Sequence, residues 1–262
     1  MKLKQNIKNL YIKIFKAEKT KFKIVSVGSG CDIKLFMINP LLPHYQTEFF
    51  DFLWNFDGGL LSVKKIIESD FDGFSNQSDY YFGLHPKWDS SLDFQLKPDQ
   101  VSLQYHEKDI SYNIPYKYPE IAFMHYPDLE WIENTYPKRI KQFQKFLKAK
   151  DTYFVYYRQY DEPINSIYIN EKDYDLDSKL DYWVRESIEF ANFLDNLNKN
   201  IKVLSLFALP HNFDQNDLSH YKFPQIPKNL VFDFTFYKDL NPEDHEPIKK
   251  EMKRVFDKFL VI

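Results

Sequence analysis

Apolar residues recur along this chain in two patterns, one typical of buried strands and one typical of amphipathic helices. Short β-branched or continuous apolar runs predict strands at 22–27, 121–126, 152–157, 201–209 and 230–237. Apolar residues at helical spacing predict helices at 60–67, 135–148 and 180–197, and a last helix that follows Asn241 and Pro242. Because strands and helices alternate, we expect an α/β fold with a mostly parallel central sheet flanked by helices.

Residues 71–120 interrupt this alternation. They are rich in Asp, Ser, Asn, Gly and Pro, and short alternating runs at 92–96, 101–105 and 110–114 predict strands. The polar turn at 106–109 would join the last two runs as a hairpin. Since there is no internal repeat and no low-complexity linker, we interpret 71–120 as a β-rich insertion within a single domain of residues 1–262.

The composition narrows the class of protein. The 262 residues are 44% hydrophobic and 28% charged, which supports a sizeable core and a polar surface. The net charge of −3 argues against a general nucleic-acid-binding protein. The single cysteine excludes an internal disulfide and a cysteine zinc cluster. No run approaches the ~18 apolar residues of a membrane span, and the N-terminal residues do not match a secretory signal. We therefore expect a cytoplasmic protein.

Two stretches of the chain are locally basic. Residues 1–20 carry six lysines among apolar residues at roughly helical spacing, and residues 138–150 contain lysine and arginine but no acid. The simpler interpretation of each is an element that packs on the domain with its cations in solvent. The alternatives are a basic amphipathic segment at 1–20 that contacts an anionic membrane surface, and a helix at 138–150 that attracts an anionic polymer or lipid headgroup.

The candidate chemistry starts where the strand at 22–27 ends. Gly28, Ser29 and Gly30 form a predicted tight turn, and Cys31, the only cysteine, follows at the expected start of a helix. Unpaired N–H groups and the helix dipole would lower the pKa of the thiol there, and the same N–H groups could hold an oxyanion. The simpler interpretation is a turn followed by a small buried thiol.

This turn matches no cofactor motif. Ile33 stands where a dinucleotide-binding G-x-G-x-x-G motif needs glycine, and the turn does not match the G-x-x-x-x-G-K phosphate loop either. No histidine pair has the sequence spacing of metal ligands. We therefore predict neither a cofactor nor a metal ion.

A thiol nucleophile needs a base, and His125 has the best predicted position among the seven histidines. It lies near the end of the predicted strand at 121–126, and sites in open α/β sheets gather at the carboxyl ends of strands. Cys31 also follows a strand end, so both groups would lie at one edge of the sheet. Asp128 or Asp51 could orient the imidazole, although each also suits a helix cap or a turn.

Two further polar residues follow predicted strand ends. His211 comes after the apolar strand at 201–209 and is a reserve base. Arg158 follows the strand at 152–157, where it could bind an anionic group of a substrate. Its alternative interpretation is a surface ion pair.

Several short motifs follow one another in a characteristic order. They are a strand that ends in Leu-Gly-Ser-Asn-Cys, a Pro-Phe-Asp-Trp-Ile motif, an Asp-Phe pair, a His-Asp-Phe strand end, a Tyr-x-Arg-Arg-Ile-x-Arg-Phe helix and a strand that ends in Arg. This chain has corresponding segments at 27–31, 49–53, 70–71, 125–128, 136–143 and 158. It thus resembles a bacterial and viral family described as papain-like cysteine peptidases (DUF1796). It departs at Gly30, where the family has Asn, and at Tyr126 and Pro127, which separate His125 from Asp128.

The resemblance implies that Cys31 is the nucleophile and His125 the base, and it adds a papain-like α+β fold as the alternative architecture. We predict a hydrolase or acyl transferase in which His125 deprotonates Cys31 and the thiolate attacks an acyl or amide carbonyl. The substrate would be a small molecule, a peptide or a glycan. The residues expected to bind it are Gly28, Gly30, Arg158 and His211.

Two other functions stay open. A strand followed by Gly-Ser at a sheet edge also resembles SGNH-type hydrolases and transferases, in which Ser29 would be the nucleophile and a cell-envelope polysaccharide the substrate. A non-catalytic protein could use the same edge to bind a glycan or an anionic ligand.

Overall fold

The computed structural model describes most of the predicted elements. The described residues are 23–28, 49–52, 59–83, 112–118, 121, 123, 129–159, 176–210, 218–237, 250, 253–255 and 257–259. The basic segment at 1–20, the predicted strands at 92–96 and 101–105, and the Asn241–Pro242 helix start lie outside them.

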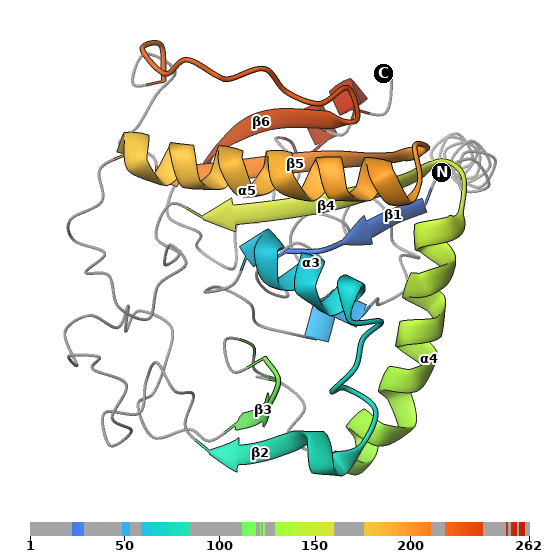
Figure 1. Cartoon of the computed structure of the whole chain (residues 1–262). Helices are drawn as coiled ribbons and strands as arrows, with labels where there is room; N and C mark the ends of the chain where they lie inside the picture. The colour runs from blue at the N-terminus through green and yellow to red at the C-terminus, as the bar shows by residue number, and fades with distance from the viewer. Residues whose placement is uncertain are drawn as a thin grey trace, which may run out of the picture.

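A parallel sheet forms the centre of the fold (Figure 1). It has four strands in the order β1-β4-β5-β6, and every neighbouring pair is parallel. The strands are β1 (Lys23–Ser26), β4 (Thr152–Gln159), β5 (Ile201–Pro210) and β6 (Leu230–Tyr237). Four predicted strands are thereby confirmed, and the fold is α/β rather than the α+β alternative.

The three long helices pack on one face of this sheet, and the C-terminal helical residues contact the other. The long helices are α3 (Gly59–Glu68), α4 (Leu129–Lys148) and α5 (Leu176–Leu197), and residues 253–255 and 257–259 are also helical. Side chains of β4 alternate between the faces, so Tyr156 bonds to Glu186 of α5 while Tyr153 packs on Phe259 of the C-terminal helical residues. Among the described residues, no helix is both long and apolar enough to cross a lipid bilayer.

Helix α4 begins six residues before its predicted start at 135, so that expectation is wrong at the N-terminal end. Leu129, Trp131 and Ile132 extend its apolar face upstream and pack against the core. Pro137 therefore lies inside the helix, where it removes one backbone hydrogen bond. Buried side chains on both sides of the proline, Ile132 and Ile140, keep the helix continuous.

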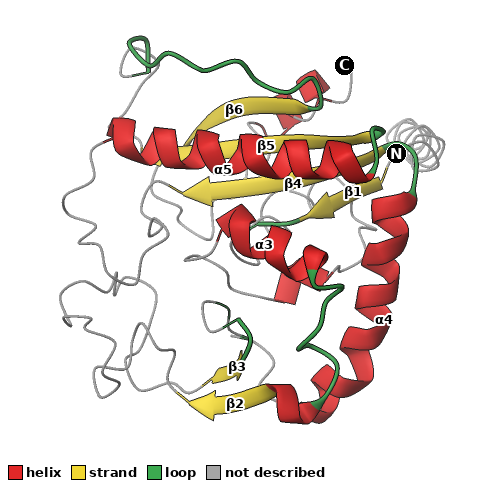
Figure 2. Cartoon of the chain, viewed as in Figure 1, coloured by secondary structure: helices red, strands yellow, loops and turns green. Residues whose placement is uncertain are grey.

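The predicted β-rich insertion contains an antiparallel pair, β2 (Tyr80–Gly83) and β3 (Tyr112–Pro115), apart from the main sheet (Figure 2). Strand β3 overlaps the predicted strand at 110–114, but its observed partner is β2. The strand predicted at 121–126 is not found in the described residues: Phe123 makes only an isolated antiparallel bridge to Asn113. Its ring packs on the rings of Tyr80 and Tyr136, so tertiary contacts hold this segment near the insertion.

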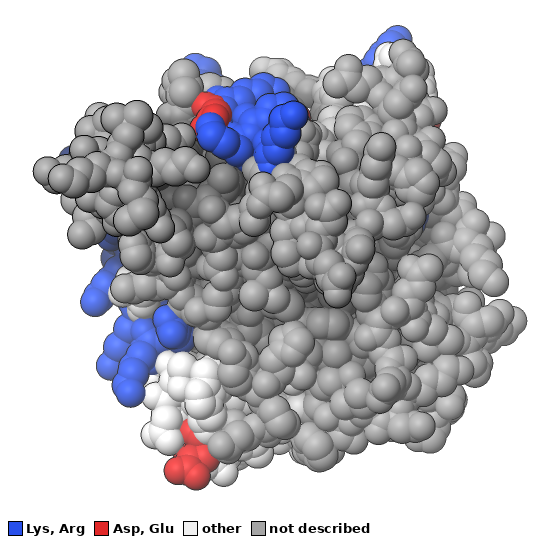
Figure 3. Space-filling model, turned by 180° about the vertical axis from the view of Figure 1, so that it is seen from behind, with Lys and Arg blue, Asp and Glu red and all other residues white. Residues whose placement is uncertain are grey.

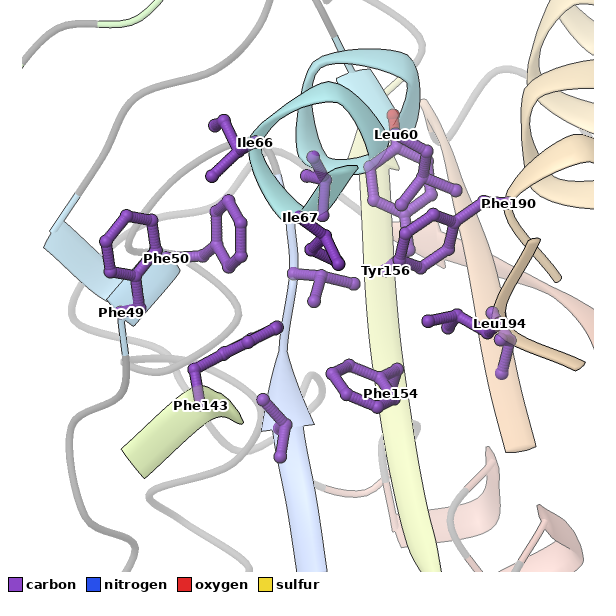
Figure 4. Close-up of a cluster of buried hydrophobic side chains, with 14 of the residues drawn as sticks. Phe49, Phe50, Leu60, Ile66, Ile67, Phe143, Phe154, Tyr156, Phe190 and Leu194 are labelled. Atoms are coloured by element: carbon purple, nitrogen blue, oxygen red, sulfur yellow. The ribbon is translucent and has the colours of Figure 1, made fainter. Parts of the chain in front are cut away.

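The core beneath α3 is largely aromatic (Figure 4). Phe49, in the short 3-10 helix η2 (Phe49–Phe52), is fully buried. Its ring makes edge-to-face contacts at centroid distances of 4.8 to 5.2 Å with four aromatic rings, those of Phe50, Phe71, Phe74 and Tyr136. Such pairs add to the stabilisation from burial of apolar surface. Phe49 thus joins η2, α4 and the turn after α3.

We expect Phe49→Ala to lower the free energy of unfolding by about 3–5 kcal/mol, because it leaves a cavity among packed rings. Phe223→Ala is the matched control, since Phe223 is 40% exposed, and it should cost about 1 kcal/mol or less. Urea unfolding followed by fluorescence measures both. Equal losses in the two variants would contradict the central position of Phe49.

Candidate functional site

The structure describes three of the nine predicted site residues. Gly28 and Arg158 are described, and the backbone of Asp51 lies in η2. The other six lie outside the described residues: Ser29, Gly30, Cys31, His125, Asp128 and His211. The described part of the site is therefore the sheet edge at which β1 and β5 end, just before Ser29 and His211 in the chain.

Gly28 marks the carboxyl end of β1. Ser26 is in register with Val155 of β4, and the Val27 N–H donates to the Val155 carbonyl at 2.9 Å. Strand β4 continues to Gln159, so its last residues extend beyond the end of β1. Gly28 is buried and forms a bend, so the chain leaves the sheet here at its carboxyl edge.

Arg158 lies on the extended part of β4, and its side chain is only 2% exposed. Its Nη1 atom is 3.4 Å from Oε1 of Glu186 in α5 and donates to the Tyr156 hydroxyl at 3.0 Å. The guanidinium also lies over the ring of Tyr182, 5.2 Å from its centroid. The ion pair expected as one alternative exists, but it is buried and not on the surface.

Glu186 is the partner that holds these elements together, and its side chain has no exposed surface. Oε1 accepts a hydrogen bond from the Tyr156 hydroxyl at 2.8 Å. Oε2 accepts one from the Leu60 N–H at 2.9 Å, in the first turn of α3. A single carboxylate therefore connects α5, the end of β4 and the start of α3 (Figure 4 shows Tyr156 beside Leu60).

The charges around Glu186 have opposing effects on its ionisation. Burial raises the pKa of Glu186, because removal from water disfavours the carboxylate. The charge of Arg158 and the hydrogen bonds from Tyr156 and Leu60 lower the pKa in opposition. The positive end of the α3 dipole also favours a negative charge at this position.

Gly59 permits the close approach of α3 to Glu186. Its φ of +50° lies in the left-handed region, which side chains rarely adopt. A Cβ atom at this position would lie 2.2 Å from Oε2 of Glu186 and 3.1 Å from the Tyr156 hydroxyl. Glycine at position 59 is therefore needed for both the backbone conformation and the space.

Sequence reasoning identified Arg158 but missed Glu186. A signal was present, since Glu186 falls between Trp183 and Phe190 on the apolar stripe of its helix. An acid on such a stripe needs a buried partner, and an arginine at a strand end is the natural choice. In the structure the guanidinium neutralises Glu186, and a role in binding substrate stays a prediction.

The structural basis for His125 is weaker than expected. His125 comes two residues after Phe123, which bridges to β3 and does not join the parallel sheet. Its assignment as the base thus depends on the family resemblance. Within the described ranges, no group of three or more His, Cys, Asp or Glu side chains could hold a metal ion.

Comparisons of this chain with protein-family models, with curated proteins and with solved structures give no match. The resemblance to the papain-like cysteine peptidase family therefore stays a prediction. What is known of the site comes from its own residues.

We expect Glu186→Ala to lower the free energy of unfolding by about 3–5 kcal/mol. The substitution removes the acceptor of three buried donors and leaves the Arg158 guanidinium without its carboxylate. Glu189→Ala, one turn along α5, is the matched control. Glu189 pairs with Lys64 where their side chains are 47% and 25% exposed, so its loss should cost about 1 kcal/mol or less. Similar losses in urea unfolding would argue against an anchoring role for Glu186.

The free energy of unfolding should also depend on pH through the ionisation of Glu186. Its folded pKa is raised above the unfolded value of about 4.3, so the folded chain binds more protons between the two pKa values. The free energy of unfolding therefore falls as the pH rises from about 4.3 through the folded pKa, and it levels off above. Glu186→Gln cannot titrate and lacks this contribution.

Urea unfolding of the wild type and Glu186→Gln at steps from about pH 4 to 8 measures this difference. We expect the stability of the wild type relative to the variant to decline as the pH rises. The two proteins differ only at position 186, so the difference between their pH profiles isolates the contribution of Glu186. A difference that stays constant or grows with pH would mean that the pKa of Glu186 is not raised.

Proposed function

We propose that this protein is a hydrolase or acyl transferase with Cys31 as its nucleophile and His125 as its base. The observation that carries the proposal is the end of β1 at the carboxyl edge of a parallel α/β sheet. Ser29, Gly30 and Cys31 follow Gly28 directly in the chain, and ligands of open α/β sheets bind outside the carboxyl ends of strands.

The described part of this edge supports a reactive turn. Arg158 and Glu186 are buried there as a pair, and they attach the start of α3 to the end of β4. A turn that leaves β1 beside these elements starts from a rigid base. Rigid support is what a nucleophile and its oxyanion donors require, because small displacements cost much of the rate.

The proposed reaction has two steps. His125 takes the proton of Cys31, and the thiolate sulfur bonds to the carbonyl carbon of the substrate. Backbone N–H groups of the turn would hold the oxyanion until the C–X bond breaks and the leaving group takes the proton from His125. Water, deprotonated by His125, then attacks the thioester and restores the thiol. In a transferase, an acceptor amine or alcohol replaces water.

A serine mechanism is the second candidate. The α/β architecture supports it, because SGNH-type enzymes have such a fold, whereas the papain-like fold implied by the family resemblance is α+β. The parallel sheet is the setting expected for an SGNH-type enzyme, in which Ser29 follows the first strand. The base would then deprotonate the Ser29 hydroxyl, and the intermediate would be an ester. The two candidates use the same edge and differ in which residue is acylated.

We expect the Cys31 thiol to be a thiolate at lower pH than an ordinary thiol, whose pKa is about 8.5. Iodoacetamide should alkylate the native chain about tenfold faster at neutral pH than the urea-unfolded chain, since one pKa unit is a tenfold change in thiolate. Intact-mass spectrometry follows the reaction unambiguously because Cys31 is the only cysteine. His125→Ala should return the pH midpoint toward that of the unfolded chain.

His220→Ala is the control for that variant, because His220 is exposed and paired with Asp177. It should leave the alkylation profile unchanged. A native profile identical to that of the unfolded chain would reject the thiol mechanism. Acetylation by p-nitrophenyl acetate then separates the candidates: loss in Cys31→Ala supports the thiol, and loss only in Ser29→Ala supports the serine. No acetylation of either residue would favour the non-catalytic ligand-binding alternative.

A further inference from the structure

The outer face of α4 carries a straight row of lysines. Lys138, Lys141, Lys145 and Lys148 are all exposed, and their spacing of three, four and three residues places them on one side of the helix. Over ten residues this lysine face spans about 15 Å. It lies opposite the buried face, which includes Ile140 and Phe143.

No described acid neutralises this lysine face. None of its four members forms an ion pair with a described residue, whereas Lys64 and Lys117 elsewhere on the surface do. The helix dipole explains cations in the last turn, but Lys138 and Lys141 lie well before it. The helix dipole therefore accounts for Lys145 and Lys148 but not for Lys138 and Lys141.

More positive charge adjoins the C-terminal end of α4. Lys150 is exposed just beyond the helix. Lys23 at the start of β1 lies over the ring of Phe146, 5.3 Å from its centroid, and its backbone N–H donates to the Asp151 carbonyl. Residues 1–20, which precede Lys23 in the sequence, contain six lysines and one acid, Glu18. Figure 3 shows basic side chains on the side of the molecule where α4 runs.

We propose that the lysine face of α4 docks this protein on a bilayer surface that contains anionic lipids. Clusters of four to eight cations on one side of a helix suit anionic headgroups, and a straight helix can place all of them at one plane. The whole chain is acidic at −3, so the positive charge is concentrated locally and would orient the molecule.

A membrane fits these features better than a nucleic acid. The row consists of lysines without exposed aromatic residues between them, so it offers no surface on which bases could stack. The N-terminal sequence, residues 1–20, interleaves Ile7, Leu10 and Ile14 with lysines, which is the composition of a segment that lies in a lipid interface. Apolar residues of this kind would gain nothing from a phosphate backbone in water.

Vesicle co-sedimentation of the full chain tests the proposal. The wild type should bind phosphatidylcholine vesicles that contain about 30% phosphatidylglycerol, and not vesicles of phosphatidylcholine alone. Lys141→Gln with Lys145→Gln should weaken this binding by about tenfold or more. Lys65→Gln with Lys222→Gln is the matched control, because it removes the same charge from exposed sites outside α4 and should change binding by less than about twofold. Raising the salt to about 0.5 M should release the wild type.

Three results would overturn the proposal. The first is no binding to the anionic vesicles at low salt, and the second is an equal loss in the two double variants. The third is tighter binding to a single-stranded oligonucleotide than to the vesicles, with the same dependence on Lys141 and Lys145. Circular dichroism of each variant establishes that it is folded, and the alkylation rate of Cys31 should be unchanged, so this test is independent of the proposed chemistry.

Discussion

The buried contact between Arg158 and Glu186 is the constraint on which the carboxyl edge of the sheet depends. Two opposite charges have been removed from water at a site where desolvation is costly. The arrangement is stable because each polar atom finds a partner: Tyr156 bridges the pair, and the Leu60 N–H reaches the second carboxylate oxygen. If one member moved, the others would lose these buried hydrogen bonds, so strand, helix and helix start must move together.

That requirement fixes the surroundings of β1. Strand β1 is held on β4 by four residue pairs and by the bond from Val27 to Val155. Helix α3 begins against Glu186 at Gly59, the position that tolerates the close approach. The chain thus leaves β1 at Gly28, in a region whose described neighbours are held in place. A nucleophile that follows Gly28, as proposed, would depend on this buried charge pair for its placement.

Sequence periodicity correctly predicted the elements whose own apolar pattern determines their secondary structure. It failed where contacts with residues distant in the sequence determine the structure. Strands β4, β5 and β6 and helix α3 have continuous or regular apolar patterns, and these are confirmed. Helix α4 continues through Pro137 because Ile132 and Ile140, on either side of the proline, are both buried in the core. The sequence predicts Phe123 to be a strand residue. In the structure it makes only one β-bridge, to Asn113, and its ring packs on Tyr80 and Tyr136. For the site, sequence could name Arg158, but its partner lies 28 residues away and on another element.

The buried Arg158–Glu186 pair and the lysine face of α4 respond differently to salt and pH. Arg158 and Glu186 are shielded from solvent, so added salt screens their attraction little, whereas protons reach the pair through the ionisation of Glu186. The lysine face of α4 is exposed to solvent, so added salt screens its field, over about 10 Å at 0.1 M ionic strength. Ionic strength would therefore act on the proposed docking surface, and pH on the Arg158–Glu186 pair at the carboxyl edge of the sheet. Membrane docking through the lysine face, as proposed, would leave the Arg158–Glu186 pair undisturbed, because the two features have no residue in common.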